Sequence, residues 1–75
     1  MKELLKAQNR TRVWYGDLEI IEQCAKLNNI HDHPQKTITK ILNALEKSND
    51  FEKSHIYADI NGRKRRYRCF SLKNN

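Results

Sequence analysis

The clearest structural signal is a predicted β-hairpin in residues 54–72, SHIYADINGRKRRYRCFSL. Asn61-Gly62 lies at its centre, and both residue types tolerate the positive φ angles that a two-residue type I′ turn requires. The flanking residues are rich in the β-branched and aromatic side chains that favour strands. A two-residue turn also fixes the register, so that the expected pairs run from Ile60–Arg63 to Ile56–Tyr67 and His55–Arg68.

The second strand of this hairpin is strongly basic. Residues 63–68 contain five cationic side chains, those of Arg63, Lys64, Arg65, Arg66 and Arg68. Neither face of a two-stranded ribbon can bury so many charges, so the tip is expected in solvent. The other end, with Ile56, Tyr67 and Phe70, is expected to return to a core. A basic ribbon of this kind suits a polyanionic partner.

The net charge of +6 comes from one end of the chain. Residues 1–59 contain nine Lys/Arg and nine Asp/Glu, whereas residues 60–75 contain six Lys/Arg and no acidic residue. This asymmetry indicates a localised anion-binding surface on the hairpin and tail.

Length and composition predict a single small domain spanning residues 1–75, with a frayed tail at about 73–75. A composition of 37% hydrophobic and 32% charged residues is typical of a folded protein. Cys24 and Cys69 are too few for a disulfide framework and suit small packing positions, so a reduced, cytoplasmic protein is expected. The apolar runs are only a few residues long, and no membrane-spanning segment is expected.

The first half of the chain predicts a helix, a strand and a second helix. Residues 2–9 suit two helical turns with Leu4, Leu5 and Ala7 inward, and residues 10–15 suit a short strand. Trp14 is expected in the core, while Tyr15 is equally compatible with packing and with stacking on a base. Residues 18–28 are expected to form a helix capped by Asp17 and ended by Asn28-Asn29. Its expected inward residues are Leu18, Ile21, Cys24 and Ala25.

A third helix is predicted from Pro34 to about Ser48, with Asp32 or His33 as its cap. It has the strongest periodic signal in the chain, an apolar stripe made by Ile38, Ile41, Leu42 and Leu45. At 100° per residue, the opposite side carries Lys36, Lys40, Asn43 and Lys47, with Thr39 on its flank.

The expected order of elements is helix, strand, helix, turn, helix and two-stranded ribbon, which is an α+β arrangement. Its carriers are the segments DLEIIEQCAKLNNI, HPQKTITKILNALEKSNDF and INGRKRRYRCFSL. In this order the chain resembles the winged helix-turn-helix family, with these segments as first helix, recognition helix and wing. The pattern TITKILNALEKS followed by GRKRRYR is similar to small bacterial, archaeal and viral regulators. One departure is the turn NNIHDHP, which is longer than a minimal turn and lacks Gly.

The resemblance implies double-stranded DNA as the partner and a small transcriptional or recombination regulator as the function. It places the third helix in the major groove and the wing on the flanking backbone or minor groove. Side-chain chemistry allows Gln35 and Asn43 to pair with adenine, Lys36 and Lys40 to reach guanine or phosphate, and Thr39 to touch a thymine methyl. The wing side chains suited to phosphates or a narrow minor groove are Arg63, Lys64, Arg65, Arg66 and Arg68.

Other readings stay open on the sequence alone. The wing could grip an acidic partner protein, or it could bind RNA with Tyr57, Tyr67 or Tyr15 as stacking residues. Leu4 and Leu5 could seal a homodimer. His31-Asp32-His33 lacks a second close pair of ligands, so no metal site is expected. No phosphate-binding loop, nucleophile motif or cofactor fingerprint is present, and neither an enzyme nor a cofactor is expected.

Overall fold

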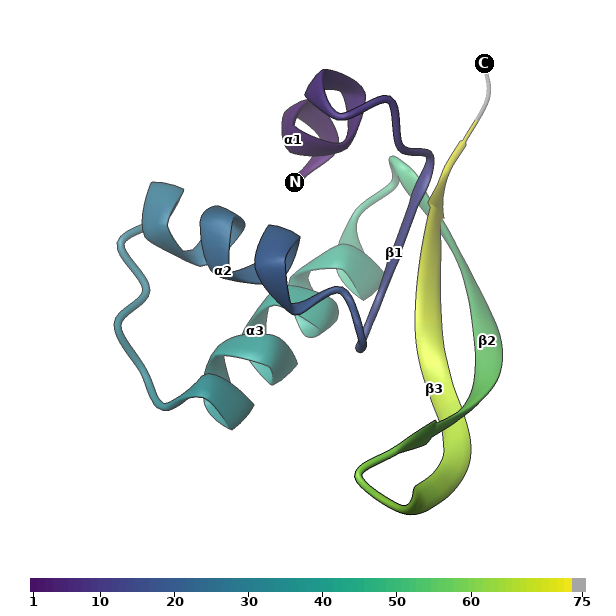
Figure 1. Ribbon diagram of the computed structural model, residues 1–75. Helices are drawn as coiled ribbons and strands as arrows, with labels where there is room; N and C mark the ends of the chain where they lie inside the picture. Colours follow the sequence, from purple (N-terminus) through teal and green to yellow (C-terminus); the bar gives the residue numbers. More distant parts are fainter. Residues whose placement is uncertain (74–75) are drawn as a thin grey trace.

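The computed structural model describes residues 1–73 and contains three helices and a three-stranded antiparallel sheet (Figure 1). The elements follow the expected order. They are α1 (Lys2–Ala7), β1 (Arg12–Trp14), α2 (Leu18–Leu27), α3 (Pro34–Lys47), β2 (Phe51–Ile60) and β3 (Arg63–Leu72). β3 is the central strand, between β1 and β2. This α+β arrangement is the winged-helix-like layout that the sequence predicts.

The predicted hairpin is confirmed in type and register. β2 and β3 pair along their whole length, from Phe51–Leu72 to Ile60–Arg63. Both turn residues are left-handed, with φ angles of 53° at Asn61 and 78° at Gly62. The two-residue turn therefore fixes which side chains share a face over ten residue pairs, as expected from its local chemistry.

A substitution in this turn tests the conformational requirement in isolation. A Cβ added at Gly62 would meet no atom within 4 Å, so Gly62→Ala adds no clash and only forces a side chain into the left-handed region. We expect a loss of about 1–2 kcal/mol in the free energy of unfolding, measured by chemical denaturation. Asn61→Gly is the control and should be tolerated, because glycine adopts the same φ readily. Equal stability of Gly62→Ala and wild type would contradict this role.

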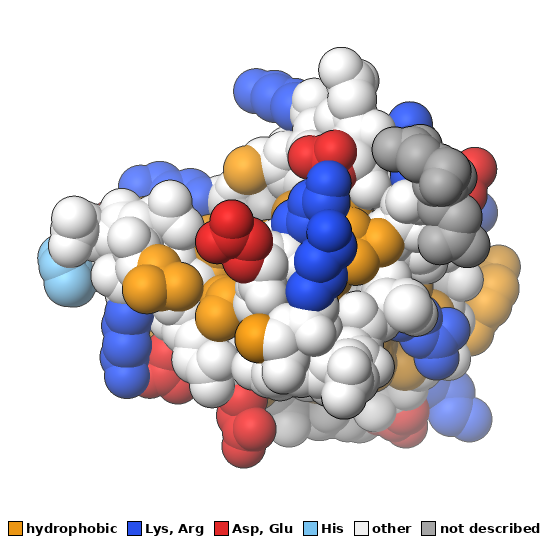
Figure 2. All heavy atoms as spheres, turned by 90° about the horizontal axis from the view of Figure 1, so that it is seen from above, with side chains coloured by type: hydrophobic (Ala, Val, Ile, Leu, Met, Phe, Trp, Pro, Cys, Tyr) orange, Lys and Arg blue, Asp and Glu red, His pale blue; other side chains and the backbone are white. Residues whose placement is uncertain are grey.

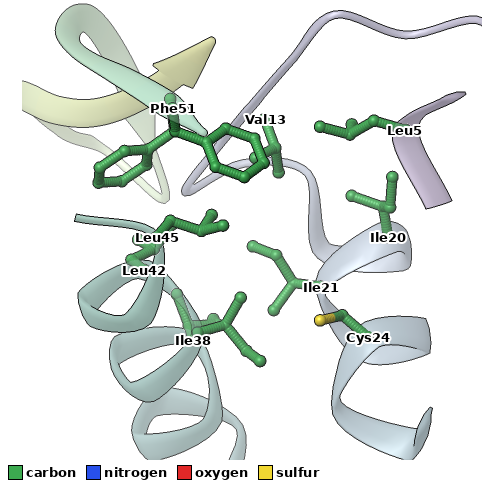
Figure 3. Close-up of a cluster of buried hydrophobic side chains, with 11 residues drawn as sticks. Leu5, Val13, Ile20, Ile21, Cys24, Ile38, Leu42, Leu45 and Phe51 are labelled. Carbon is green, nitrogen blue, oxygen red and sulfur yellow. The ribbon is translucent and has the colours of Figure 1, made fainter. Parts of the chain in front are cut away.

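The core lies between the helices and one face of the sheet (Figure 3). The predicted α3 stripe is confirmed, because its four side chains are each at most 5% exposed. In Figure 3 this stripe faces α2 across the core, and Phe51 and Val13 close the top of the cluster. The remaining buried members of the cluster are Leu5, Ile20, Ile21, Cys24 and Phe70.

The predicted inward face of α2 is partly wrong. Leu18 is 55% exposed, whereas Ile20, which was not expected inside, is 1% exposed. The reason is tertiary: α2 contacts α1 on one side and α3 on the other, so its buried arc is shifted toward α1, where Leu5 lies near Ile20 (Figure 3). Asp17 stands at the start of α2, but its side chain does not cap the helix. It accepts a hydrogen bond from the Trp14 backbone at 3.0 Å and pairs with Arg10 at 2.7 Å.

The N-terminal elements are shorter than predicted. α1 ends at Ala7 because Asn9 adopts a φ of 55° and the Arg10 N–H closes the helix by donating to the Leu5 carbonyl at 2.8 Å. Ala7 itself is exposed, so its predicted inward position is wrong. Leu5 is fully buried and Leu4 packs against the core. Of these two leucines, only the half-buried Leu4 has surface left for a homodimer contact, and the homodimer stays a prediction.

Trp14 does not join the core as predicted. It alternates with Val13 along β1, so it lies on the other face of the sheet and is half-buried. Its indole lies over Gly16, where an added Cβ would come within 2.3 Å of the ring. Close packing against Gly16 and the Tyr67 ring replaces the predicted core position.

The turns around α3 follow the predictions more closely. Asn29 has a φ of 55°, and the Ile30 N–H donates to the Ala25 carbonyl at 2.9 Å, which ends α2 as expected. His33 caps α3, because its Nδ1 accepts a hydrogen bond from the Gln35 N–H at 3.3 Å. The extra residues of this turn thus serve to bring Ile30 against the core before α3 begins.

The C-terminal tail is held at its first residue. The Lys73 N–H donates to the Asp50 carbonyl at 3.0 Å, which joins this residue to the turn before β2. The rest of the expected frayed tail, residues 74–75, lies outside the described residues. No helix within residues 1–73 is long and apolar enough to cross a membrane.

Candidate functional site

A groove of about 690 Å³ separates the N-terminal half of α3 from the tip of the β2–β3 hairpin. The hairpin does not project straight from the body, because its turn bends back beneath α3 (Figure 1). This curvature brings the turn close to the N-terminal half of α3. The lining residues are Tyr15, Gln35, Thr39, Leu42, Ile60, Asn61, Arg63, Arg65, Arg66, Tyr67 and Arg68.

The groove brings together six of the ten residues predicted to bind DNA, namely Gln35, Thr39, Arg63, Arg65, Arg66 and Arg68. Lys36 and Lys40 do not line it. They border a shallower depression of about 290 Å³ on the outer side of α3, together with Gln35 and Thr39. Because these last two residues belong to both surfaces, the outer face of α3 and the groove form one continuous surface.

Four exposed cations form the tip of the hairpin; we call Arg63, Lys64, Arg65 and Arg66 the basic tip. Within residues 1–73, none of the four forms an ion pair with an acidic side chain. Their charges are therefore not compensated within the described part of the domain and remain available to an anionic partner.

Arg68 differs from the basic tip, although sequence reasoning grouped them together. Its side chain is 28% exposed, and its Nη1 donates a hydrogen bond to Asn43 Oδ1 at 2.8 Å. The same Nη1 lies 3.6 Å from Glu46 Oε1, which also binds Lys53 Nζ at 2.9 Å. The hydrogen bond from Lys53 is the main cause that keeps the pKa of Glu46 below its usual value. These contacts tie the base of the hairpin to α3.

The contact with Arg68 changes what Asn43 can do. Asn43 is exposed on α3, as predicted, but its amide oxygen already accepts a hydrogen bond. Pairing with adenine uses both the oxygen and the amino group of the amide. Asn43 would therefore have to release Arg68 before it could read a base in that way.

Lys40 is also held within the domain. Its ammonium group pairs with the Asp32 carboxylate in the turn before α3, and this hydrogen bond is the main cause that lowers the pKa of Asp32. Lys36 and Lys47, by contrast, are exposed and form no ion pair within residues 1–73. These two lysines are the cations of α3 that face solvent without a partner in the described chain.

An aromatic cluster closes the other end of the groove. The Tyr15 hydroxyl donates to Gln35 Oε1 at 2.8 Å, and its ring lies 5.0 Å from the Tyr67 ring at an angle of 31°. Trp14 meets Tyr67 edge-on, with ring centroids 5.9 Å apart. Tyr15 thus links α3 to β3 through the Tyr67 ring.

The sequence predicted Tyr67 at the core end of the hairpin, but this residue is half-buried in the groove and does not belong to the core cluster. Tyr15 was not assigned to the groove either. Strand alternation could have found Tyr67, because it shares a face with Arg65 and Arg63. Tyr15 carries no such local signal. Its position depends on how the end of β1 approaches α3, which is a tertiary feature.

The end of the molecule opposite the hairpin turn has a different charge pattern. In Figure 2, which looks down on that end, lysine and arginine side chains alternate with acidic ones and with small hydrophobic areas. Ion pairs such as Lys2–Asp50 and Lys26–Glu22 mix the two signs in this half of the structure. The basic tip differs from this pattern, because its four cations form no ion pair within residues 1–73.

The chain matches none of the family models, curated proteins or solved structures with which it was compared.

Proposed function

We propose that this domain binds double-stranded DNA at specific sites, as a small transcriptional or recombination regulator of the winged helix-turn-helix type. α3 enters the major groove, and the β2–β3 hairpin lies on the adjacent backbone or in the minor groove. The observation that carries the proposal is the basic tip beside the exposed side of α3, whose four exposed cations have no acidic partner within residues 1–73.

Charge on a narrow hairpin favours the phosphate backbone over a flat acidic surface. Duplex DNA presents a regular row of phosphates, and each Lys or Arg that neutralises one of them releases a counterion. Four cations at the end of a ribbon can follow such a row while the body of the domain stays to one side. These contacts supply affinity and orientation but carry no sequence information.

The exposed side of α3 supplies the groups that can read bases. Lys36 has no acidic partner in the part of the chain that the structure describes and can donate to the guanine O6 and N7 atoms, and Thr39 can contact a thymine methyl. The Thr39 hydroxyl already donates to the Gln35 carbonyl at 3.0 Å. Since Gln35 and Thr39 border both the outer face and the groove, base-reading and backbone-holding groups adjoin one another.

Titration of a labelled duplex of random sequence at two salt concentrations tests DNA binding, and selection from a random pool tests specificity. We expect binding whose association constant falls steeply with salt, and a preferred site at least tenfold tighter than random duplex. Failure to bind duplex DNA at low salt would reject the proposed function. Binding without any preferred site would reject the regulator role.

Asn43→Ala distinguishes a base contact from a structural contact with Arg68. If Asn43 reads a base, the variant should lose about 1–3 kcal/mol of binding free energy on the selected site and little on a scrambled duplex. Lys47→Ala is the control, because the removal of a lysine at the end of α3 should weaken binding to the selected site and to the scrambled duplex equally. Equal losses for Asn43→Ala on both duplexes would show that the residue acts only by holding Arg68.

A further inference from the structure

The groove between α3 and the basic tip contains aromatic side chains that binding to an intact duplex does not require. A paired duplex offers phosphates and sugars at its surface and stacks its bases inside. Arginines alone would suffice for that surface. Here the groove also contains the half-buried rings of Tyr15 and Tyr67. Aromatic side chains beside cations are the combination that binds unpaired bases by stacking.

The size of the groove fits one small organic molecule. Its volume of about 690 Å³ lies within the range of about 300–1,000 Å³ that is typical of ligand pockets. A nucleotide is a molecule of that class, whereas a double helix is far too wide to enter. The groove therefore suits a single nucleotide that has left the stack.

Gln35 provides a polar group at the aromatic end. Its Oε1 accepts the hydrogen bond from the Tyr15 hydroxyl, and its Nε2 amino group has no protein partner within residues 1–73. The bond from Tyr15 orients the amide, and its two N–H donors have no acceptor among the described residues. Carbonyl oxygens on the edges of thymine, cytosine or guanine are suitable acceptors. Arg65 and Arg66 line the same groove and can neutralise the phosphate of the same nucleotide.

We infer, on the basis of the proposed DNA binding, that this groove holds one unpaired nucleotide of the bound DNA. Its base lies against Tyr67 and Tyr15, its edge faces Gln35, and its phosphate lies at Arg65 and Arg66. Unstacking a base costs least where it is mismatched, bulged or already single-stranded. The domain therefore prefers duplexes that contain such a nucleotide over fully paired ones.

The test compares a fully paired duplex with the same duplex carrying one bulged 2-aminopurine, a base whose fluorescence depends on stacking. Wild type should bind the bulged duplex about 5- to 150-fold more tightly, the equivalent of stacking one base on an aromatic side chain. The 2-aminopurine fluorescence should change on binding. Tyr67→Leu should lose the preference and the fluorescence change, while binding the paired duplex as wild type does.

Two further variants keep the test independent of folding defects. Tyr15→Phe retains the ring but removes the hydroxyl that orients the Gln35 amide, so it should keep the fluorescence change and lose less of the preference than Tyr67→Leu. Gln35→Leu, at an exposed position of α3, should reduce the preference by about 5-fold or more because a hydrogen bond to the base edge is lost. If wild type binds both duplexes equally and the fluorescence does not change, the groove site is rejected and the proposed duplex binding stands. If the bulged duplex alone is bound, the groove site stands and the proposed function is rejected.

Discussion

Leu42→Ala is expected to lower the free energy of unfolding by about 2–5 kcal/mol. Leu42 is 2% exposed and lies on the α3 stripe that faces α2 across the core (Figure 3). Truncation removes buried methyl groups and leaves a cavity that a close-packed interior fills only partly. A domain of this size has a total stability of only about 5–15 kcal/mol, so one such change is a large fraction of it.

The measurement is chemical or thermal denaturation beside a matched control. Leu27→Ala makes the same chemical change on α2 at a position that is 72% exposed, and it should alter the free energy of unfolding by about 0.5 kcal/mol or less. A large difference between the two leucines supports the assigned core. Similar melting temperatures for both variants would show that the α3 stripe does not form the core.

The features that the sequence predicts well are those with a local cause. The hairpin register follows from two residues, Asn61 and Gly62, whose left-handed conformations are cheap for these side chains. The α3 stripe follows from a helical period that places Ile38, Leu42 and Leu45 on one side. In both cases the constraint acts within a few residues, so no knowledge of the packing was needed.

The predictions that failed depend on packing between distant segments. Leu18 satisfies the helical period of α2 as well as Ile20 does, and only the position of α1 decides which of them is buried. Trp14 is large enough for the core, but the register of β1 against β3 directs it to the other face. The local sequence pattern cannot predict which of these residues is buried, since both outcomes satisfy the same periodicity.

The candidate site shows the same division. Strand alternation and composition identify the basic tip, and the α3 stripe fixes which residues face away from the core. The curvature of the hairpin toward α3 and the bond from Arg68 to Asn43 arise only when the two elements meet. Consequently, the arginines of β3 look alike in the sequence but differ in the fold, where the basic tip is exposed and Arg68 contacts α3.

Replacing the whole basic tip is expected to have the largest effect on DNA binding. The variant Arg63→Ala/Lys64→Ala/Arg65→Ala/Arg66→Ala removes four exposed cations without touching the core or the hairpin turn. If three of them neutralise phosphates, the slope of log association constant against log salt concentration should become less negative by about 2–3 in the variant. A fourfold rise in salt should then weaken wild type about 40-fold more than the variant.

The control variant removes the same charge from the other end of the molecule. Lys2, Lys6, Lys26 and Lys73 belong to α1, α2 and the C-terminal tail, away from the hairpin turn (Figure 1). Changing these four to alanine lowers the net charge by the same amount and should leave the salt dependence nearly unchanged. Both variants should unfold at temperatures close to that of wild type, because exposed charges contribute little to stability. If the two variants lose the same affinity, binding depends on net charge alone, and the basic tip is not the DNA-binding element.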